Sequence, residues 1–98
     1  MENKPLIYMF GMDFEFDPVK SESNRKKHGV DFIEAQELWL DSRHLEIQAK
    51  QVLDEPRWAL IGMLGDAVWT GIFVMRANRI RIISVRRARE EEKELYYG

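Results

Sequence analysis

Hydrophobic side chains alternate with small or acidic ones in the first patterned stretch of the chain. A phenylalanine or methionine occupies every second position: Phe10, Met12, Phe14 and Phe16. A period of two is typical of a strand that buries one of its faces. The pattern predicts a strand over residues 10–17.

The next segment carries the signals of a short helix. Asp17 is a favourable N-cap, and Pro18 suits the first helical position because a backbone N–H there has no partner within the helix. Gly29 stands where a left-handed residue can end a helix. We therefore expect a polar helix over residues 18–28.

A second helix is predicted over residues 32–41. Asp31 can cap this helix, and Glu34 completes a capping box three residues later. Apolar side chains then recur at helical spacing, interrupted only by Gln36. They are Phe32, Ala35, Trp39 and Leu40. Because a helix usually docks on a sheet through such a stripe, we assign these side chains to the core.

Strand patterns fill most of the remaining chain. The predicted strands are an edge strand over residues 45–49 and three longer ones over residues 57–64, 67–75 and 79–85. Gly65-Asp66 and Ala77-Asn78 separate the last three at hairpin spacing, so these strands should be antiparallel neighbours.

The order of these elements indicates the fold class. Two helices precede a meander of strands, and residues 86–97 have the composition of a short final helix. We expect an α+β fold. It should have a mostly antiparallel sheet of four to five strands, two helices packed on one face and a short C-terminal helix.

Length and composition indicate one domain. The chain has 98 residues, enough for a single core, and we expect one domain over residues 1–98. It contains no cysteine, which excludes a disulfide scaffold and a thiolate zinc site. We find neither the ~18 consecutive apolar residues of a membrane helix nor a signal-like segment. A cytoplasmic protein with no membrane partner is therefore expected.

Charge is distributed unevenly along the chain. The net charge of −2 argues against a general nucleic-acid coat protein. Six arginines nevertheless lie between residues 76 and 89 with no acid among them: Arg76, Arg79, Arg81, Arg86, Arg87 and Arg89. The acids gather in residues 13–17 and 90–94. The arginines either pair with these acids or bind a phosphate-bearing partner.

Strand parity divides these arginines between the faces of the predicted sheet. Arg79 and Arg81 share one face of the last strand. Regular alternation gives Arg86 the parity of Ile80 and Ile82 instead. The arginines therefore need not all face one site.

Other candidate residues lie on neighbouring segments. Arg57 opens one predicted strand and Arg76 closes the next. The ends of antiparallel neighbours meet, so these two side chains can converge. Lys27 and His28 lie with Asn24 on one side of the first helix, a pattern that an ordinary solvated helix face would also give.

Motifs for metal or nucleotide chemistry are missing. The chain lacks a glycine-rich phosphate loop, a G-x-S-x-G motif and an H-x-x-x-H pair. The two histidines, His28 and His44, lie sixteen residues apart without a carboxylate at ligand spacing. We expect neither a metal site nor a cofactor.

Three blocks of sequence, in a fixed order and spacing, carry a family resemblance. The first is FEFDPVK at residues 14–20, continued by Asn24 and by KHGVDF-EA within residues 27–35. The second is EPRW at residues 55–58, followed by Ile61-Gly62. The third is IRIISVRRA at residues 80–88, followed by Glu92 and Tyr96. Together they resemble the signatures of BrnT-like toxins, which belong to the RelE-like ribonuclease superfamily. Val85 and Lys93 depart from the family's usual Ala and Arg.

This resemblance implies a ribonuclease toxin of a type II toxin–antitoxin system. Its partners would be an RNA substrate and a DNA-binding antitoxin similar to BrnA, in a hetero-oligomeric complex. The implied reaction is attack of a ribose 2′-hydroxyl on its own 3′-phosphate, which needs no metal and cannot use DNA. The products would be a 2′,3′-cyclic phosphate and a 5′-hydroxyl end.

The resemblance also implies roles for residues. The base or positioning group would come from the first helix, as Lys27 or His28. Two arginines from separate blocks would hold the phosphate: Arg57 and Arg86. The leaving group would be assisted by Arg76 or Tyr96. Further RNA contacts are expected from Arg79, Arg81 and Arg87.

Two other hypotheses remain open from the sequence. The first is a binding module whose arginine-rich face holds an antitoxin segment or nucleic acid, with cleavage weak or lost. The second is a structural domain whose arginines neutralise its own acidic segments. High salt would destabilise such a domain by screening its ion pairs.

Overall fold

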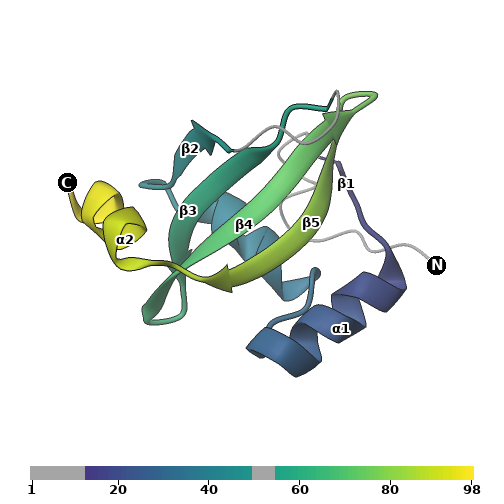
Figure 1. Cartoon of the computed structure of the whole chain (residues 1–98), viewed down its shortest axis with the longest axis horizontal. Coiled ribbons are helices and arrows are strands. Elements are labelled where there is room, and N and C mark those ends of the chain that lie inside the picture. The colour runs from purple at the N-terminus through teal and green to yellow at the C-terminus, as the bar shows by residue number, and fades with distance from the viewer. Residues whose placement is uncertain (1–12, 50–54) are drawn as a thin grey trace.

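The computed structural model describes residues 13–49 and 55–98 as a sheet with three helical segments (Figure 1). The elements, in chain order, are β1 (Phe14–Glu15), α1 (Pro18–His28), η2 (Glu34–Leu40), β2 (Leu45–Gln48), β3 (Trp58–Leu64), β4 (Ala67–Arg76), β5 (Arg79–Arg87) and α2 (Glu90–Tyr97). Here η2 is a 3₁₀ helix, whereas α1 and α2 are α-helices. In Figure 1, η2 lies behind the sheet and α1 runs below β5.

The sheet has five strands in the order β1-β5-β4-β3-β2. Every pair is antiparallel except β1 with β5, which is parallel. The chain starts at one edge, crosses to the other through α1 and η2, and returns as a meander until β5 meets β1. The α+β prediction is confirmed, with one parallel pair in an otherwise antiparallel sheet.

The predicted meander strands are confirmed with small shifts at their ends. Strand β4 extends to Arg76 and β5 extends to Arg87, beyond the predicted ends at residues 75 and 85. The predicted strand over residues 10–17 is shorter where it is described, since β1 covers only Phe14–Glu15. Residues 10–12 lie outside the described part of the chain. After β1 the chain leaves the sheet because Asp17 already caps α1.

Helix α1 begins and ends where the sequence predicted. The Val19 amide donates to the Asp17 carboxylate at 2.9 Å, the bond of an N-cap. Gly29 has a φ of 90°, and its amide donates to the Arg25 carbonyl at 2.8 Å, as expected of a left-handed C-cap. The Ser21 hydroxyl then accepts the Phe32 amide at 2.9 Å, which ties α1 to the chain that follows it.

The second predicted helix is wrong in type and in one of its core positions. The capping box does form, because Asp31 accepts the Glu34 amide and Glu34 accepts the Asp31 amide. Beyond it the chain forms the 3₁₀ helix η2, over Glu34–Leu40 rather than residues 32–41. Its period of three buries Leu38, whereas Leu40 is 41% exposed.

The main core lies between η2 and one face of the sheet. Trp39 is at its centre, with its ring in edge-to-face contact with Phe14 and Phe73 at centroid distances of 5.1 and 5.3 Å. The end of η2 approaches β3 closely, since a Cβ built on Gly62 would lie 3.3 Å from the Leu38 carbonyl oxygen. A smaller cluster of Ile61, Val68 and Tyr96 packs α2 on the opposite face.

Gln36 is the polar residue of the η2 stripe and is 1% exposed. Among the described residues, neither its side-chain nitrogen nor its oxygen has a hydrogen-bond partner. An unsatisfied buried polar group costs about 1–3 kcal/mol. We therefore expect Gln36→Met, which keeps the side-chain length, to raise the free energy of unfolding by about 1 kcal/mol or more.

Urea denaturation measures this change in stability. The matched control is Gln48→Met on the exposed strand β2, which should shift the midpoint little. A lower midpoint for Gln36→Met would show that the buried amide is satisfied and stabilising.

Candidate functional site

A β-bulge in β5 decides which face of the sheet the arginines occupy. Ile72 pairs with Ser84 and Phe73 pairs with Ile82, so Ile83 is an extra residue in β5. Beyond the bulge, the alternation of β5 side chains between the two faces of the sheet is shifted by one residue. Ile82 and Val85 are therefore both buried in the main core.

The predicted parity of Arg86 is therefore wrong. Across the sheet, Arg79 lies opposite Arg76, Arg81 opposite Val74 and Arg86 opposite Thr70. Directly paired residues project to the same side, and Thr70, Val74 and Arg76 share one side of β4. We call the side that carries Arg76, Arg79, Arg81 and Arg86 the arginine face. It is the face on which α2 packs, opposite η2.

Glu55 lies among three arginines at one end of this face. It accepts two hydrogen bonds from Arg76, at 2.8 and 3.0 Å. The pKa of Glu55 is lowered chiefly by this hydrogen bond, and the charges of Arg76, Arg57 and Arg81 lower it further. We call Glu55, Arg57, Arg76 and Arg81 the Glu55 cluster. The side chains of Glu55 and Arg76 are 39% and 50% exposed, so both are accessible from solvent.

Other arginines of the face contact acids near the start of the described chain. Arg79 lies 3.2 Å from Asp13 and 3.6 Å from Glu15. Arg81 lies 3.3 Å from Glu15, at the parallel β1–β5 pairing. For these two arginines, the pairing with the chain's own acids that the sequence allowed is present.

Arg86 is paired at the other end of the face, under α2. Its two terminal nitrogens donate to both oxygens of Glu92 at 2.8 and 2.9 Å. The Thr70 hydroxyl and the Arg89 amide donate to the same carboxylate at 2.9 and 2.7 Å. These bonds, led by that from Arg86, lower the pKa of Glu92 to about 2 although burial opposes the shift. Arg86 thus holds the first turn of α2 on the sheet.

Tyr96 holds the other end of α2. Its hydroxyl donates to Asp41 at 2.6 Å, and the same carboxylate oxygen accepts the Met63 amide at 2.8 Å. The hydrogen bond from the Tyr96 hydroxyl to Asp41 is the main cause that raises the pKa of Tyr96. Burial alone would raise the pKa of Asp41. The hydrogen bonds from Tyr96 and from the amides of Arg43 and Met63 lower it instead.

The chain can now be compared with known proteins. The family model described as "Ribonuclease toxin, BrnT, of type II toxin-antitoxin system" matches residues 16–92. The chain belongs to the BrnT family. Membership implies an RNA substrate and an antitoxin partner, and it confirms the BrnT resemblance found in the sequence. No curated protein matches the chain.

The matched region holds the candidate residues from the BrnT resemblance, apart from Tyr96, but they do not form one group. Lys27 and His28 are exposed in the last turn of α1. That helix lies at the edge of β5, where the buried Asn24 amide bonds to both the N–H and the C=O of Val85. Arg87 projects away from the arginine face, with its guanidinium 5.2 Å from the centre of the Trp69 ring.

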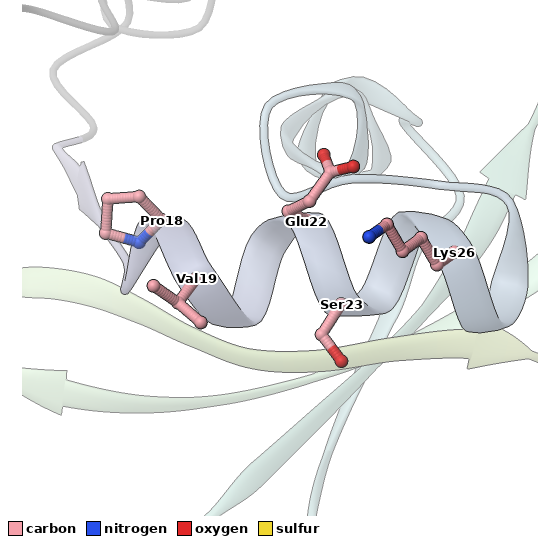
Figure 2. Close-up of a pocket in the computed structure, with 5 residues that line it drawn as sticks. All are labelled: Pro18, Val19, Glu22, Ser23 and Lys26. Atoms are coloured by element: carbon pink, nitrogen blue, oxygen red, sulfur yellow. The ribbon is translucent and has the colours of Figure 1, made fainter.

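The outer side of α1 also carries a recess of about 460 Å³. Figure 2 shows that the labelled side chains around it all come from this helix: Pro18, Val19, Glu22, Ser23 and Lys26. The arginines of the arginine face do not contribute to this lining, so the recess is separate from the Glu55 cluster.

Two further properties of this BrnT-family chain bear on its site. Within residues 13–49 and 55–98, no helix is long and apolar enough to cross a membrane. In the same ranges, no three His, Asp or Glu side chains are grouped as metal ligands would be.

Sequence reasoning missed three carboxylates that organise the arginine face. Glu55 was noted only as part of a family block and Asp41 only as a helix end, while Glu92 was noted in a family block and among the acids of residues 90–94, without being assigned to Arg86. A signal was present for Glu55, which stands two residues before Arg57 in the second block. The partner of Arg86 was less visible, because strand parity had placed that arginine on the wrong face.

The contacts of Arg86 predict its effect on stability. The folded-state pKa of Glu92 lies below the usual value of 4.5, so its ionised form stabilises the fold. This contribution is fully present above pH ~4.5 and is lost as the pH falls toward about 2. A shift of this size corresponds to at most about 3 kcal/mol, shared among all the donors to Glu92.

We therefore expect Arg86→Ala to lower the free energy of unfolding by about 2 kcal/mol at pH 7. The loss should shrink as the pH approaches 2. Guanidinium denaturation at several pH values tests this, with Arg76→Ala in a more exposed pair as the control, which should cost less. Equal stability of Arg86→Ala and the native chain at pH 7 would contradict the anchoring role.

Proposed function

We propose that this BrnT-family chain cleaves RNA without a metal, using the Glu55 cluster to activate the 2′-hydroxyl and to stabilise the phosphorane. The family model gives the coarser activity, that of a ribonuclease toxin. The finer step is attack of a ribose 2′-oxygen on the adjacent phosphorus with departure of the 5′-oxygen. A cognate antitoxin similar to BrnA would cover this face.

One observation supports the proposal above others: an accessible carboxylate is hydrogen-bonded to one arginine and lies within the electrostatic influence of two more from separate segments. Arg57 precedes β3, Arg76 ends β4 and Arg81 lies within β5. Arg76 contacts Glu55 directly, and this hydrogen bond is the main cause that lowers the pKa of Glu55, with smaller contributions from the charges of Arg57 and Arg81. A phosphodiester brings negative charge that such guanidinium groups bind well, since they remain charged and can donate two hydrogen bonds each.

Each member of the cluster has a role in this reaction. Glu55 is ionised at neutral pH and accepts the proton of the 2′-hydroxyl. Arg57 and Arg81 bind the nonbridging phosphate oxygens, where charge grows in the transition state. Arg76 orients Glu55 and donates a hydrogen bond to the departing 5′-oxygen, which takes its proton from water. The low pKa of Glu55 makes it a weak base, so the arginines supply most of the acceleration.

The other candidates serve as supports and RNA contacts in this proposal. Arg86 and Tyr96 bind carboxylates and keep α2 in place, so any help to the chemistry is indirect. Arg79 adds positive charge beside the cluster. Lys27 and His28, at the exposed end of α1, are proposed to contact RNA away from the reacting bond.

Two substitutions in the cluster test the catalytic proposal. Glu55→Gln should reduce cleavage of single-stranded RNA about 10²-fold, the low end for loss of a general base, because the lowered pKa of Glu55 makes it a weak one. Arg57→Ala should reduce it about 10²–10³-fold by removing a donor to the developing charge. Both should keep nearly the native melting temperature because their side chains are solvent-accessible. Cleavage rates and thermal unfolding would be measured on the same preparations.

The controls separate this chemistry from other nucleases. Cleavage should persist in EDTA, leave a 2′,3′-cyclic phosphate and spare DNA of the same sequence. Loss on chelation with recovery on adding Mg²⁺ would contradict the proposal. So would full activity of Glu55→Gln. Cleavage should fall only at acidic pH, as Glu55 becomes protonated below its ordinary pKa of 4.5.

A non-catalytic binding module is the second candidate function. The observation that favours it is the pairing of Arg79, Arg81 and Arg86 with the chain's own acids, which leaves fewer charges for phosphate. Antitoxin binding alone would then be the function of the arginine face.

Growth after induced expression separates the two candidates. A catalytic toxin should arrest growth, and Glu55→Gln at equal protein level should relieve the arrest. Coexpression of the cognate antitoxin should also relieve it. Unimpaired growth with the native chain at high level would favour the binding module.

A further inference from the structure

A second recess lies at the opposite end of the sheet from the Glu55 cluster. It has a volume of about 280 Å³ and lies between the β3–β4 turn, the end of β5 and α2. Its floor is held together by the backbone, since the Ala88 amide donates to the Val68 carbonyl at 3.0 Å. Drug-sized ligands occupy pockets of about 300–1,000 Å³, so this recess suits a smaller group.

Helix α2 supplies one wall through Lys93 and Tyr97. These residues are four apart and therefore lie on one side of the helix. Glu92 and Tyr96, one position earlier, point to the arginine face and hold the helix there. Because Glu92 and Tyr96 anchor α2 to the sheet, the wall formed by Lys93 and Tyr97 is held in place. The Tyr97 side chain is still 60% exposed.

The other wall is formed by the β3–β4 turn and the end of β5. Arg87 lines the recess at the end of β5, but its guanidinium lies over the Trp69 ring, at 5.2 Å, on the side of the sheet opposite α2. Asp66 comes from the β3–β4 turn on the other side of the recess. The Lys93 ammonium group, 2.8 Å from Glu90, stays 40% exposed. An aromatic ring, a cation and a carboxylate therefore border one small recess.

We propose that this recess binds one nucleotide of the RNA substrate and gives the chain a preference for guanine. Tyr97 stacks on the base, as exposed aromatic side chains do with unpaired RNA bases. Lys93 binds the nucleotide's phosphate. Asp66 accepts the adjacent N1–H and N2–H donors of guanine, a pair that the other bases do not offer a carboxylate. The inference rests on the proposed function and adds the base that the substrate presents.

A binding experiment on the full chain tests this site without requiring cleavage. Titration calorimetry would compare the four nucleoside 3′-monophosphates, guanosine and inorganic phosphate. The guanosine monophosphate should bind most tightly. Tyr97→Ala should weaken its binding roughly tenfold or more, and Tyr97→Phe, which keeps the ring, should not. Asp66→Asn should remove the preference for guanine.

Leu95→Ala is the matched control, because Leu95 is 54% exposed on α2 and does not line the recess. It should leave binding unchanged, and circular dichroism would confirm that each variant keeps the native helix content. Equal binding of phosphate and all nucleotides, or native affinity in Tyr97→Ala, would overturn the inference. So would binding of an acidic antitoxin peptide, but no nucleotide, at this recess.

The two proposals fail separately. RNA cleavage without nucleotide binding at the recess would support the catalytic role of the Glu55 cluster and contradict the proposed base site. Guanine-selective binding that Tyr97→Ala abolishes, in a chain that cuts no RNA, would support the recess and remove the catalytic proposal.

Discussion

One extra residue in β5 sets how the two faces of the sheet are used. Ile83 forms the bulge, so that Ile82 before it and Val85 after it both enter the main core. Regular alternation would have turned Val85 outward and pointed Arg86 into the apolar layer under η2. An unpaired guanidinium buried there would cost several kcal/mol. The bulge therefore lets an arginine-rich segment follow a core strand without a conflict between charge and burial.

Acidic segments of the chain form ion pairs with arginines of the arginine face. The carboxylates of the β1 region pair with Arg79 and Arg81, and the first turn of α2 pairs with Arg86. These pairings explain how a chain of net charge −2 carries so many arginines on one face. Positive charge is locally in excess around Glu55, where Arg57, Arg76 and Arg81 act on a single carboxylate. A local excess of this kind attracts a phosphate irrespective of the total charge.

Much of the fold was predictable because local signals agree with tertiary packing. The caps of α1 and the hairpin turns of the meander depend on a few neighbouring residues, and they formed as expected. The type of η2 was not predictable, since a short segment pressed against β3 near Gly62 tightens in response to packing. No local sequence signal predicted the bulge at Ile83 either. Missing it misplaced Arg86 and hid its pairing with Glu92. Strand order alone predicted that Arg57 and Arg76 lie at neighbouring strand ends, and the charges of both act on Glu55.

The side chain of Asn24 imitates a strand. Its amide donates to the Val85 carbonyl at 2.9 Å and accepts the Val85 amide at 3.1 Å, as a neighbouring peptide group would. Strand β1 pairs with β5 only near Ile80 and Arg81, so Asn24 closes the β5 edge further along. An exposed strand edge is a template for pairing with another chain. The Val85 backbone groups at this edge are therefore already hydrogen-bonded. A partner that binds by adding a β-strand to this sheet has to pair elsewhere than at Val85 of β5.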